Sequence, residues 1–356
     1  MKKIRVILAG LLVMGLIISL SGCGTTASKA TNESKETQKV GTKEDALAFY
    51  NGKTLNYIVP YATGGGYDLY ARLVVPYLQK YIPGTTVVIR NIDGGGGLIG
   101  TNELYMSKAD GLTFGIVNGI GVLTSQVVGQ QGVKYDLTKM IWLARYNNEP
   151  KMTVVNATTP YKTIDDLKNT KTPLKFGVSG VGSSEYIGLE VTKKLFVPTM
   201  DIIPGYNNNT EADVAMLRGE VVGTSGSLSS KQALLDQKKV TPVLFYGPQK
   251  DPNFPNVPLA TDLLSDKDKE FAQGYINLLQ LGRGVGAPPG VPEERVALLR
   301  EAFQKALSDP ELLDKAKAQK LDIQYLSGPD EANIIKQSLQ MPADLKDLMS
   351  KALTSK

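Results

Sequence analysis

Two glycine-rich segments contain the residues of this chain that are best suited to bind a small anion. The first is Tyr57-Ile-Val-Pro-Tyr-Ala-Thr-Gly-Gly-Gly-Tyr-Asp68, and the second runs from Val87 to Gly100. In each, a β-favouring apolar run predicts a strand, the glycines predict a tight turn, and a helical pattern follows. Backbone N–H groups at such turns and at helix starts attract anions. Two such loops side by side would form a cradle for a small anion; without a ligand they would be ordinary strand-to-helix turns.

The candidate ligand residues of these loops are mainly glycines, whose N–H groups would face a carboxylate. Tyr61 would line the pocket. Asp68 stands where a helix N-cap is expected, and it is predicted to cap that helix rather than touch the ligand. It could also simply pair with Arg72, four residues further along the helix. The candidates from this half are Tyr61, Gly64, Gly65, Asp68, Gly95, Gly96 and Gly97.

The sequence contains few residue patterns that would support an enzyme active site. It contains no histidine, which excludes Ser-His-Asp triads and histidine metal sites, and no metal site is predicted. Gly95-x-Gly97-x-x-Gly100 follows a predicted strand, as in a dinucleotide fingerprint. The acidic ribose partner expected about 20 residues later is missing, because no Asp or Glu lies between Asp110 and Asp136. No cofactor is expected.

The first residues have the pattern of a bacterial lipoprotein leader. A basic start is followed by the apolar run from Val6 to Leu20 and then by Leu20-Ser-Gly-Cys23. This predicts a signal peptide over residues 1–22 and lipid attachment to Cys23, the chain's single cysteine. A plain transmembrane anchor is the alternative. Residues 23–50 are assigned to the lipidated cysteine and a flexible tether, so the protein is expected outside the cytoplasm, anchored to the cell membrane.

The net charge of the chain does not indicate nucleic-acid binding. Without residues 1–22 the chain has 37 Lys and Arg against 35 Asp and Glu, so no basic surface is implied. The length of 356 residues suggests about two domains.

Strand and helix patterns alternate along the rest of the chain, which predicts an α/β protein with mostly parallel sheets flanked by helices. A lobe I of residues 51–148 plus 248–356 and a lobe II of residues 149–247 are expected, joined by two crossings. Predicted strands lie at 54–59, 85–91, 112–117, 141–145, 152–155, 174–178, 201–203, 220–224, 241–246 and 275–287. Predicted helices lie at 68–81, 98–108, 120–128, 164–168, 186–196, 211–217, 293–307 and 311–319, and from Pro329 onward.

Lobe II also has small polar residues where its strands end. In open α/β sheets, ligands bind at the carboxyl ends of the strands. Hydroxyl and amide groups there could hold a second carboxylate, a substituent or waters. The candidates are Ser179, Gly182, Ser183, Tyr206, Asn207 and Ser225.

An ordered set of motifs resembles the substrate-binding proteins of tripartite tricarboxylate transporters, also called Bug or TctC-type receptors. Pro60-Tyr-Ala-Thr-Gly-Gly-Gly-Tyr-Asp-Leu-Tyr-Ala-Arg72 is similar to the family's Pro-Phe-x-x-Gly-Gly-x-x-Asp-x-x-Ala-Arg. Asn91-Ile-Asp-Gly-Gly-Gly-Gly-Leu-Ile-Gly100 is similar to Asn-Arg-x-Gly-Ala-Gly-Gly-x-x-Gly. Further matches are Asp110-Gly-Leu-Thr-Phe114, Pro204-Gly-Tyr206, Pro255-Asn-Val-Pro258 and Ala287-Pro-Pro-Gly-Val-Pro292.

This resemblance implies a two-lobed fold of the periplasmic-binding-protein (Venus flytrap) type and a monomer that is not an enzyme. It would capture a small mono-, di- or tricarboxylate between its lobes and deliver it to membrane permease subunits. Backbone N–H groups and ordered waters hold the ligand in this family, so no buried arginine clamp is expected. The chain departs from the pattern at Arg90, at Ile92-Asp93 in place of Arg-Pro, at Asn207 to Asn209, and at Tyr186 in place of a histidine.

Two other functions remain open from sequence. The same closed form could dock on the outer domain of a sensor kinase, because nothing in the residues separates sensing from transport. The second glycine loop could belong to a surface oxidoreductase, although the missing ribose partner disfavours this.

Overall fold

The structure is a computed structural model, and it describes residues 41–354. The predicted signal peptide, the predicted lipidation site at Cys23 and most of the predicted tether lie outside the described residues. Within 41–354, no helix has the length and apolar character needed to cross a bilayer.

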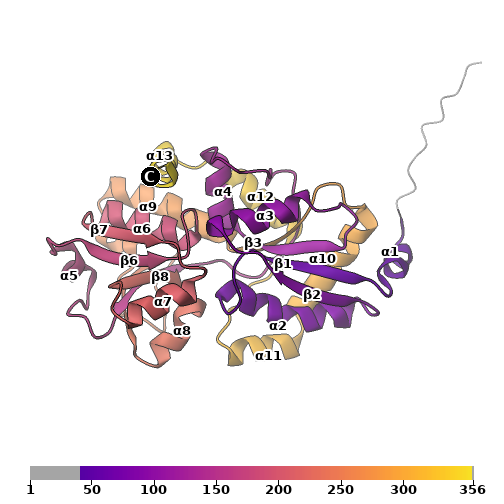
Figure 1. The fold of residues 1–356 in the computed structure, drawn as a ribbon, viewed down its shortest axis with the longest axis horizontal. Coiled ribbons are helices and arrows are strands. Elements are labelled where there is room, and N and C mark those ends of the chain that lie inside the picture. Colours follow the sequence, from indigo (N-terminus) through magenta and orange to yellow (C-terminus); the bar gives the residue numbers. More distant parts are fainter. Residues whose placement is uncertain (1–40, 355–356) are drawn as a thin grey trace, which may run out of the picture. The chain divides into compact units, whose positions relative to one another are not determined.

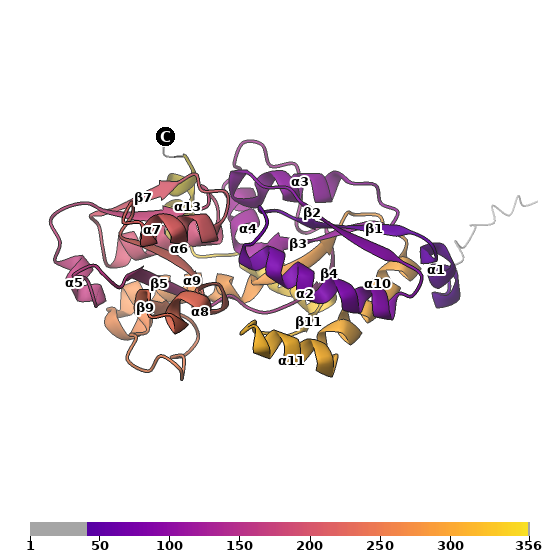
Figure 2. The same ribbon diagram turned by 60° about the horizontal axis from the view of Figure 1, so that its bottom comes forward.

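One mixed sheet forms the core of lobe I, with strand order β11-β4-β10-β3-β1-β2. β1, β2, β3 and β4 point the same way, while β10 and β11 run antiparallel to them. Helices α2, α3, α10, α11 and α12 pack around this sheet or on one another (Figures 1 and 2). The strands are Thr54–Val59 (β1), Thr86–Asn91 (β2), Thr113–Asn118 (β3), Ile141–Arg145 (β4), Arg283–Ala287 (β10) and Leu326–Ser327 (β11). The helices are Gly66–Tyr81 (α2), Leu98–Met106 (α3), Glu293–Leu307 (α10), Pro310–Ala318 (α11) and Gly328–Ser338 (α12).

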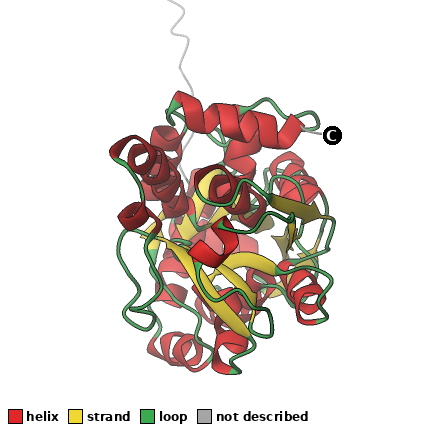
Figure 3. Cartoon of the chain, turned by 90° about the vertical axis from the view of Figure 1, so that its left-hand side faces the viewer, coloured by secondary structure: helices red, strands yellow, loops and turns green. Residues whose placement is uncertain are grey.

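A second mixed sheet forms the core of lobe II, with order β7-β6-β8-β5-β9. β6 pairs in parallel with β7 and β8, and β5 runs antiparallel between β8 and β9. Figure 3 shows strands enclosed by helices. The strands are Lys151–Asn156 (β5), Leu174–Val178 (β6), Met200–Pro204 (β7), Gly223–Ser227 (β8) and Val240–Tyr246 (β9). The helices are Ile164–Lys168 (α5), Ser184–Leu195 (α6), Asn209–Leu217 (α7) and Leu228–Asp236 (α8), while Gly119–Val127 (α4) belongs to lobe I and follows β3.

Most predicted elements are confirmed, and the two-lobed α/β architecture is confirmed with them. The sheets are mixed, however, because β5, β10 and β11 oppose their neighbours. The strand predicted at 275–287 is wrong over its first part. Asp266–Leu278 is a helix (α9), and its buried Phe271, Ala272, Tyr275 and Ile276 recur at helical spacing. Two further helical turns, Ala260–Leu263 (η2) and Leu279–Leu281 (η3), flank α9.

The predicted lobe boundaries also need correction. The last residues of the predicted tether form a helix, Lys43–Tyr50 (α1), which begins with a capping box at Thr42 and packs on α10. Helix α9 packs on α6 of lobe II, although residues 248–356 were assigned to lobe I. The last helix, Ala343–Thr354 (α13), contacts α6 and α9 as well as α4 (Figure 1). One hydrophobic cluster contains side chains of α4, α6, α9 and α13 together with residues of both sheets, so these helices bury apolar faces in a core that spans both lobes.

Two crossing segments lie side by side where the chain passes between the sheets. The Tyr146 N–H donates to the Arg283 carbonyl at 2.9 Å, and the Arg283 N–H donates to the Asn147 carbonyl at 3.1 Å. Gly282 has φ of 45°, and a Cβ there would lie 1.8 Å from the Asn147 carbonyl oxygen. Only glycine permits this close approach. The backbone hydrogen bonds described above hold the two crossing segments together.

Candidate functional site

The first glycine loop is fixed by Asp68, which is almost completely buried. Gly65 is the N-cap of α2, and the Asp68 carboxylate instead accepts hydrogen bonds from the Gly64 N–H, the Asn91 amide and Arg72. Burial opposes ionisation of Asp68, but these hydrogen bonds outweigh it and lower its pKa. The prediction of Asp68 as the N-cap is therefore wrong in detail, while its predicted pairing with Arg72 is confirmed.

The second glycine loop lies against the first. All four glycines from Gly94 to Gly97 have positive φ, which L side chains rarely adopt. The Tyr61 hydroxyl donates to the Gly96 carbonyl at 2.9 Å and accepts from the Asn118 amide at 2.7 Å. Burial raises the pKa of Tyr61 well above its ordinary value, so the hydroxyl stays a donor. The two loops predicted to form one cradle are thus adjacent, joined by the Tyr61 side chain.

Loops of lobe II meet both glycine loops. A Cβ built on Gly96 would lie 2.6 Å from the Val181 carbonyl oxygen and 2.7 Å from the Ser183 nitrogen. The Asn208 amide donates to the Thr63 carbonyl at 3.1 Å, and the Thr210 hydroxyl donates to the Gly64 carbonyl at 3.2 Å. The two lobes therefore touch at the glycine loops: the second loop meets backbone of lobe II, and the first accepts hydrogen bonds from lobe II side chains.

Of the cavities lined by these loops, two share Tyr61 and Ser179. The larger, of about 330 Å³, is lined by Tyr61, Asp93, Gly94, Gly95, Gly96, Ser179, Gly180, Val181, Pro204, Gly205, Tyr206 and Asn207. The smaller, of about 20 Å³, is lined by Tyr61, Gly65, Gly66, Tyr67, Ser179, Glu185, Asn208, Asn209, Ser230 and Arg283. Since Tyr61 and Ser179 line both, the cavities adjoin, and we call them the loop cavity and the inner cavity.

A cluster of four buried charges stands behind the inner cavity. Arg283 pairs with Glu149 at 2.6 Å, and Lys151 lies 3.3 Å from Glu149 and 3.1 Å from Glu185. All four side chains are at most 8% exposed. Burial opposes ionisation of Glu149, but Arg283 and Lys151 outweigh it and lower its pKa. The cluster is electrically balanced, with two carboxylates and two cations.

Arg283 is further held by aromatic rings. Its guanidinium lies 5.0 Å from the Tyr67 ring centre and 4.6 Å from that of Tyr70, and it donates to the Ser227 hydroxyl at 3.1 Å. Burial disfavours its charge, but Glu149 outweighs burial and raises the pKa of Arg283. Arg283 is thus a buried cation, paired with Glu149, that reaches the inner cavity from β10; that no arginine clamps the ligand stays a prediction.

The predicted site residues divide into two groups by position. Tyr61, Gly65, Gly95, Gly96, Ser179, Tyr206 and Asn207 line one or both cavities. The others support the loops. Ser183 caps α6, Gly182 faces α4 and α13, and Ser225 is buried in β8. In lobe I, the Gly64 N–H donates to Asp68, and Gly97 lies against Tyr61. Binding roles for either group are proposals, taken up below.

Sequence reasoning missed the charged residues of the cluster and Asn208 and Asn209 as lining residues. One signal was available for Arg283, since a lone charge stands between glycines in an otherwise uncharged run, Leu278 to Ala287. Charged residues at such positions are rarely buried without a partner. The partners themselves, Glu149, Lys151 and Glu185, are distant in sequence from Arg283, so only the fold could reveal them.

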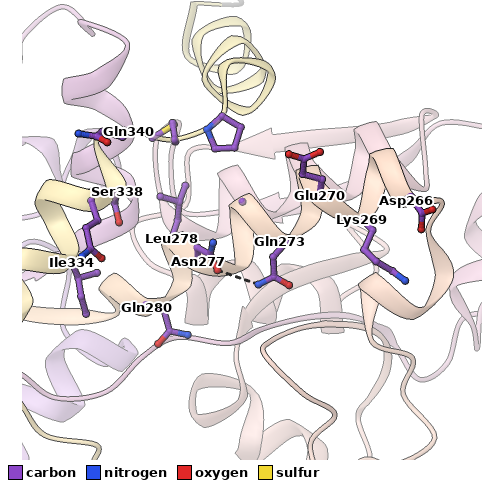
Figure 4. Close-up of a pocket in the computed structure, with 14 residues that line it drawn as sticks. Asp266, Lys269, Glu270, Gln273, Asn277, Leu278, Gln280, Ile334, Ser338 and Gln340 are labelled. Carbon is purple, nitrogen blue, oxygen red and sulfur yellow. Dashed lines mark hydrogen bonds between the residues drawn. The ribbon is translucent and has the colours of Figure 1, made fainter.

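A larger cavity, of about 840 Å³, lies away from these loops. It is formed by α9, the end of α12 and the segment leading to α13, with mainly polar side chains such as Lys269, Glu270 and Gln273 (Figure 4). No glycine loop contributes to it, and Gln273 and Asn277 bond to each other there. Its size alone does not make it a ligand site.

Known proteins of the same kind share this architecture. Residues 71–347 match the family described as the tripartite tricarboxylate transporter family receptor, TctC. Protein BugT of Bordetella pertussis is 23% identical over 276 residues, 76% of this chain and 81% of that protein. MatC from Rhodopseudomonas palustris with bound malate superimposes with a TM-score of 0.69 at 21% identity, covering 83% of this chain and 99% of MatC. Another R. palustris protein, solved with adipate, gives a TM-score of 0.70 at 21% identity, covering 84% and 97%.

The family match extends over most of the chain and includes both lobes. The family consists of solute-binding receptors rather than enzymes, and its structural neighbours are periplasmic binding proteins. The chain therefore belongs to the tripartite tricarboxylate transporter family of extracytoplasmic receptors.

Proposed function

We propose that this protein is a lipid-anchored extracytoplasmic receptor that captures a small carboxylate between its lobes and delivers it to a tripartite tricarboxylate-type membrane permease. The observation that carries the proposal is the loop cavity, which is lined by three loops that come from both lobes. Its volume of about 330 Å³ is at the lower end of ligand pockets, which suits a small solute.

Backbone donors would hold the carboxylate. Gly95 and Gly96 stand at the start of a helical turn, where N–H groups have no acceptor within the helix. N–H groups without an acceptor favour a negative ligand. Because Gly96 also touches lobe II, a ligand in this cavity contacts both lobes and stabilises the closed form.

The two relatives solved with malate and with adipate support a carboxylate ligand, since both are small acids bound by proteins of the same fold. A thermal shift panel of mono-, di- and tricarboxylates tests this. A ligand at a concentration of 100 Kd adds about 2.7 kcal/mol of apparent stability and raises Tm by several degrees. Neutral alcohols of matched size are the control. If no carboxylate raised Tm more than its neutral counterpart, the proposal would fail.

Lipid attachment at Cys23 would keep the receptor beside its permease. Its support is the leader pattern that ends in Leu20-Ser-Gly-Cys23. Replacing Cys23 with alanine is expected to move the protein from the membrane fraction to the soluble fraction, and mass spectrometry should find the acyl groups only on the native N-terminal peptide. Equal membrane fractions for both forms would argue against the anchor. Delivery is tested by measuring uptake of the identified ligand in cells that lack the permease, where uptake should be lost.

A further inference from the structure

One buried carboxyl lies beside the segments that cross between the lobes. Glu331, in the first turn of α12, is fully buried, and neither of its carboxylate oxygens has a hydrogen-bond partner within residues 41–354. A Cβ built on Gly284, the second residue of β10, would lie 3.0 Å from Glu331 Oε1. A carboxylate that is buried without hydrogen bonds is costly to ionise, so Glu331 is expected to hold a proton in this arrangement.

Arg145, the last residue of β4, lies on the same face of the sheet as this carboxyl. It is the antiparallel partner of Gly284, and directly paired residues project to the same side. The Arg145 side chain is buried, and its Nη1 donates to the Gln280 carbonyl of η3 at 2.5 Å. Its Nε has no partner in the described part of the chain. The guanidinium is therefore bonded to η3, and it keeps a free donor beside an unpartnered carboxyl.

No other charge offsets the burial of Glu331 in the part of the chain that the structure describes. α12 packs mainly on β4, β11 and η3, of which only β4 contains a charged side chain, Arg145. Burial therefore raises the pKa of Glu331 to about 8, and Arg145 opposes this shift. The other charged side chains of α12 and its surroundings are exposed or bonded elsewhere: Arg283 (to Glu149), Arg300 (to the Trp142 carbonyl), Asp330 (to Ser327) and Lys336.

We propose that Glu331 takes up a proton from solvent when the lobes close, so that ligand affinity depends on pH through this buried carboxyl. η3 continues directly from α9, which packs on α6 of lobe II, whereas Glu331 and Arg145 belong to lobe I. In the closed arrangement the Gln280 carbonyl holds Arg145, and Glu331 is neutral. Opening carries that carbonyl away with α9, the guanidinium turns to Glu331, and the carboxyl returns its proton to solvent.

The sign of the pH dependence follows from this difference between the two forms. A carboxyl whose pKa is higher in the closed form favours closure below its open-form pKa, and the effect is lost as pH rises through the closed-form pKa of about 8. Between the two values, Kd should rise by up to about tenfold for each pH unit. This inference rests on the proposed closure around a carboxylate and adds a proton to it.

Calorimetry on the purified full chain tests the proposal, with the carboxylate that gives the largest thermal shift as the probe. Titrations near pH 6.5 in two buffers of different ionisation enthalpy should show uptake of about one proton for each ligand bound. Kd should also rise by about tenfold or more from pH 5.5 to pH 7.5. A constant Kd without proton uptake would overturn this inference and leave the carboxylate proposal standing. Absence of binding by every acid would overturn both.

Variants assign the proton to its residue. E331Q keeps the shape of the side chain and is neutral at every pH, so it should take up no proton at this position and keep Kd constant within about threefold over the same range. Titration of the ligand itself is common to both proteins, so the difference between them isolates Glu331. The control E44Q removes the same charge from an exposed position on α1 and should keep the native pH dependence. Proton uptake by E331Q equal to that of the native chain would refute the assignment.

Discussion

Replacing Gly96 with alanine tests whether ligand binding requires the glycine loops to touch. The added Cβ would lie 2.6 Å from the Val181 carbonyl oxygen, 0.8 Å inside the 3.4 Å at which ordinary contact begins. The three nearest atoms, all in lobe II, are backbone atoms, so no side chain can turn away to make room. The lobes of the variant must therefore stop short of the native closed arrangement.

The expected loss follows from this overlap. Overpacking by one methyl group costs about 1–3 kcal/mol, and here the cost falls only on the closed form. A penalty of about 2 kcal/mol weakens binding roughly thirtyfold. The carboxylate with the largest thermal shift serves as the probe, with Kd measured by calorimetry and closure followed by small-angle scattering.

Gly129 provides a matched control. It has the same φ of +66° as Gly96, but a Cβ there would have nothing within 4 Å. Both alanine variants should lose about 1 kcal/mol of stability because alanine is strained at positive φ. Only G96A should lose affinity. Equal affinities of G96A and G129A, within about threefold, would refute the reasoning that closure brings these loops into contact.

Two further predictions concern buried charges. Burial raises the pKa of the Glu331 carboxyl from 4.5 to about 8, and Arg145 opposes this shift. The free energy of unfolding should therefore fall as pH rises from about 4.5 to about 8. The Tm of E331Q should rise relative to that of the native chain between pH 5 and pH 8, and parallel Tm profiles would contradict this. K231M leaves the Asp213 carboxylate buried without its cation and should lower the free energy of unfolding in urea by about 3 kcal/mol. K320M breaks the exposed pair with Asp236 and should lower it by less than about 1 kcal/mol. Equal losses in the two variants would show that burial does not set the difference.

Local patterns determined much of the fold. The run from Thr54 to Val59 and the helix from Glu293 to Leu307 have the predicted bounds, because alternating or helical apolar spacing fixes a strand or helix without distant information. The same local reasoning failed at 275–287. There an apolar run satisfied both patterns, and packing against α6 and α13 decided for a helix up to Leu278.

The alternation of strands and helices and the positions of the two glycine loops could be predicted from the sequence, because glycine conformation and apolar periodicity are properties of neighbouring residues. The leader at residues 1–22 stays a prediction. The shared buried cluster of Glu149, Lys151, Glu185 and Arg283, and the hydrogen bonds by which Asp68 holds its loop, became visible in the folded chain alone. Those contacts join residues up to 134 positions apart, and a charge's pairing depends on which residues the fold brings within a few ångströms.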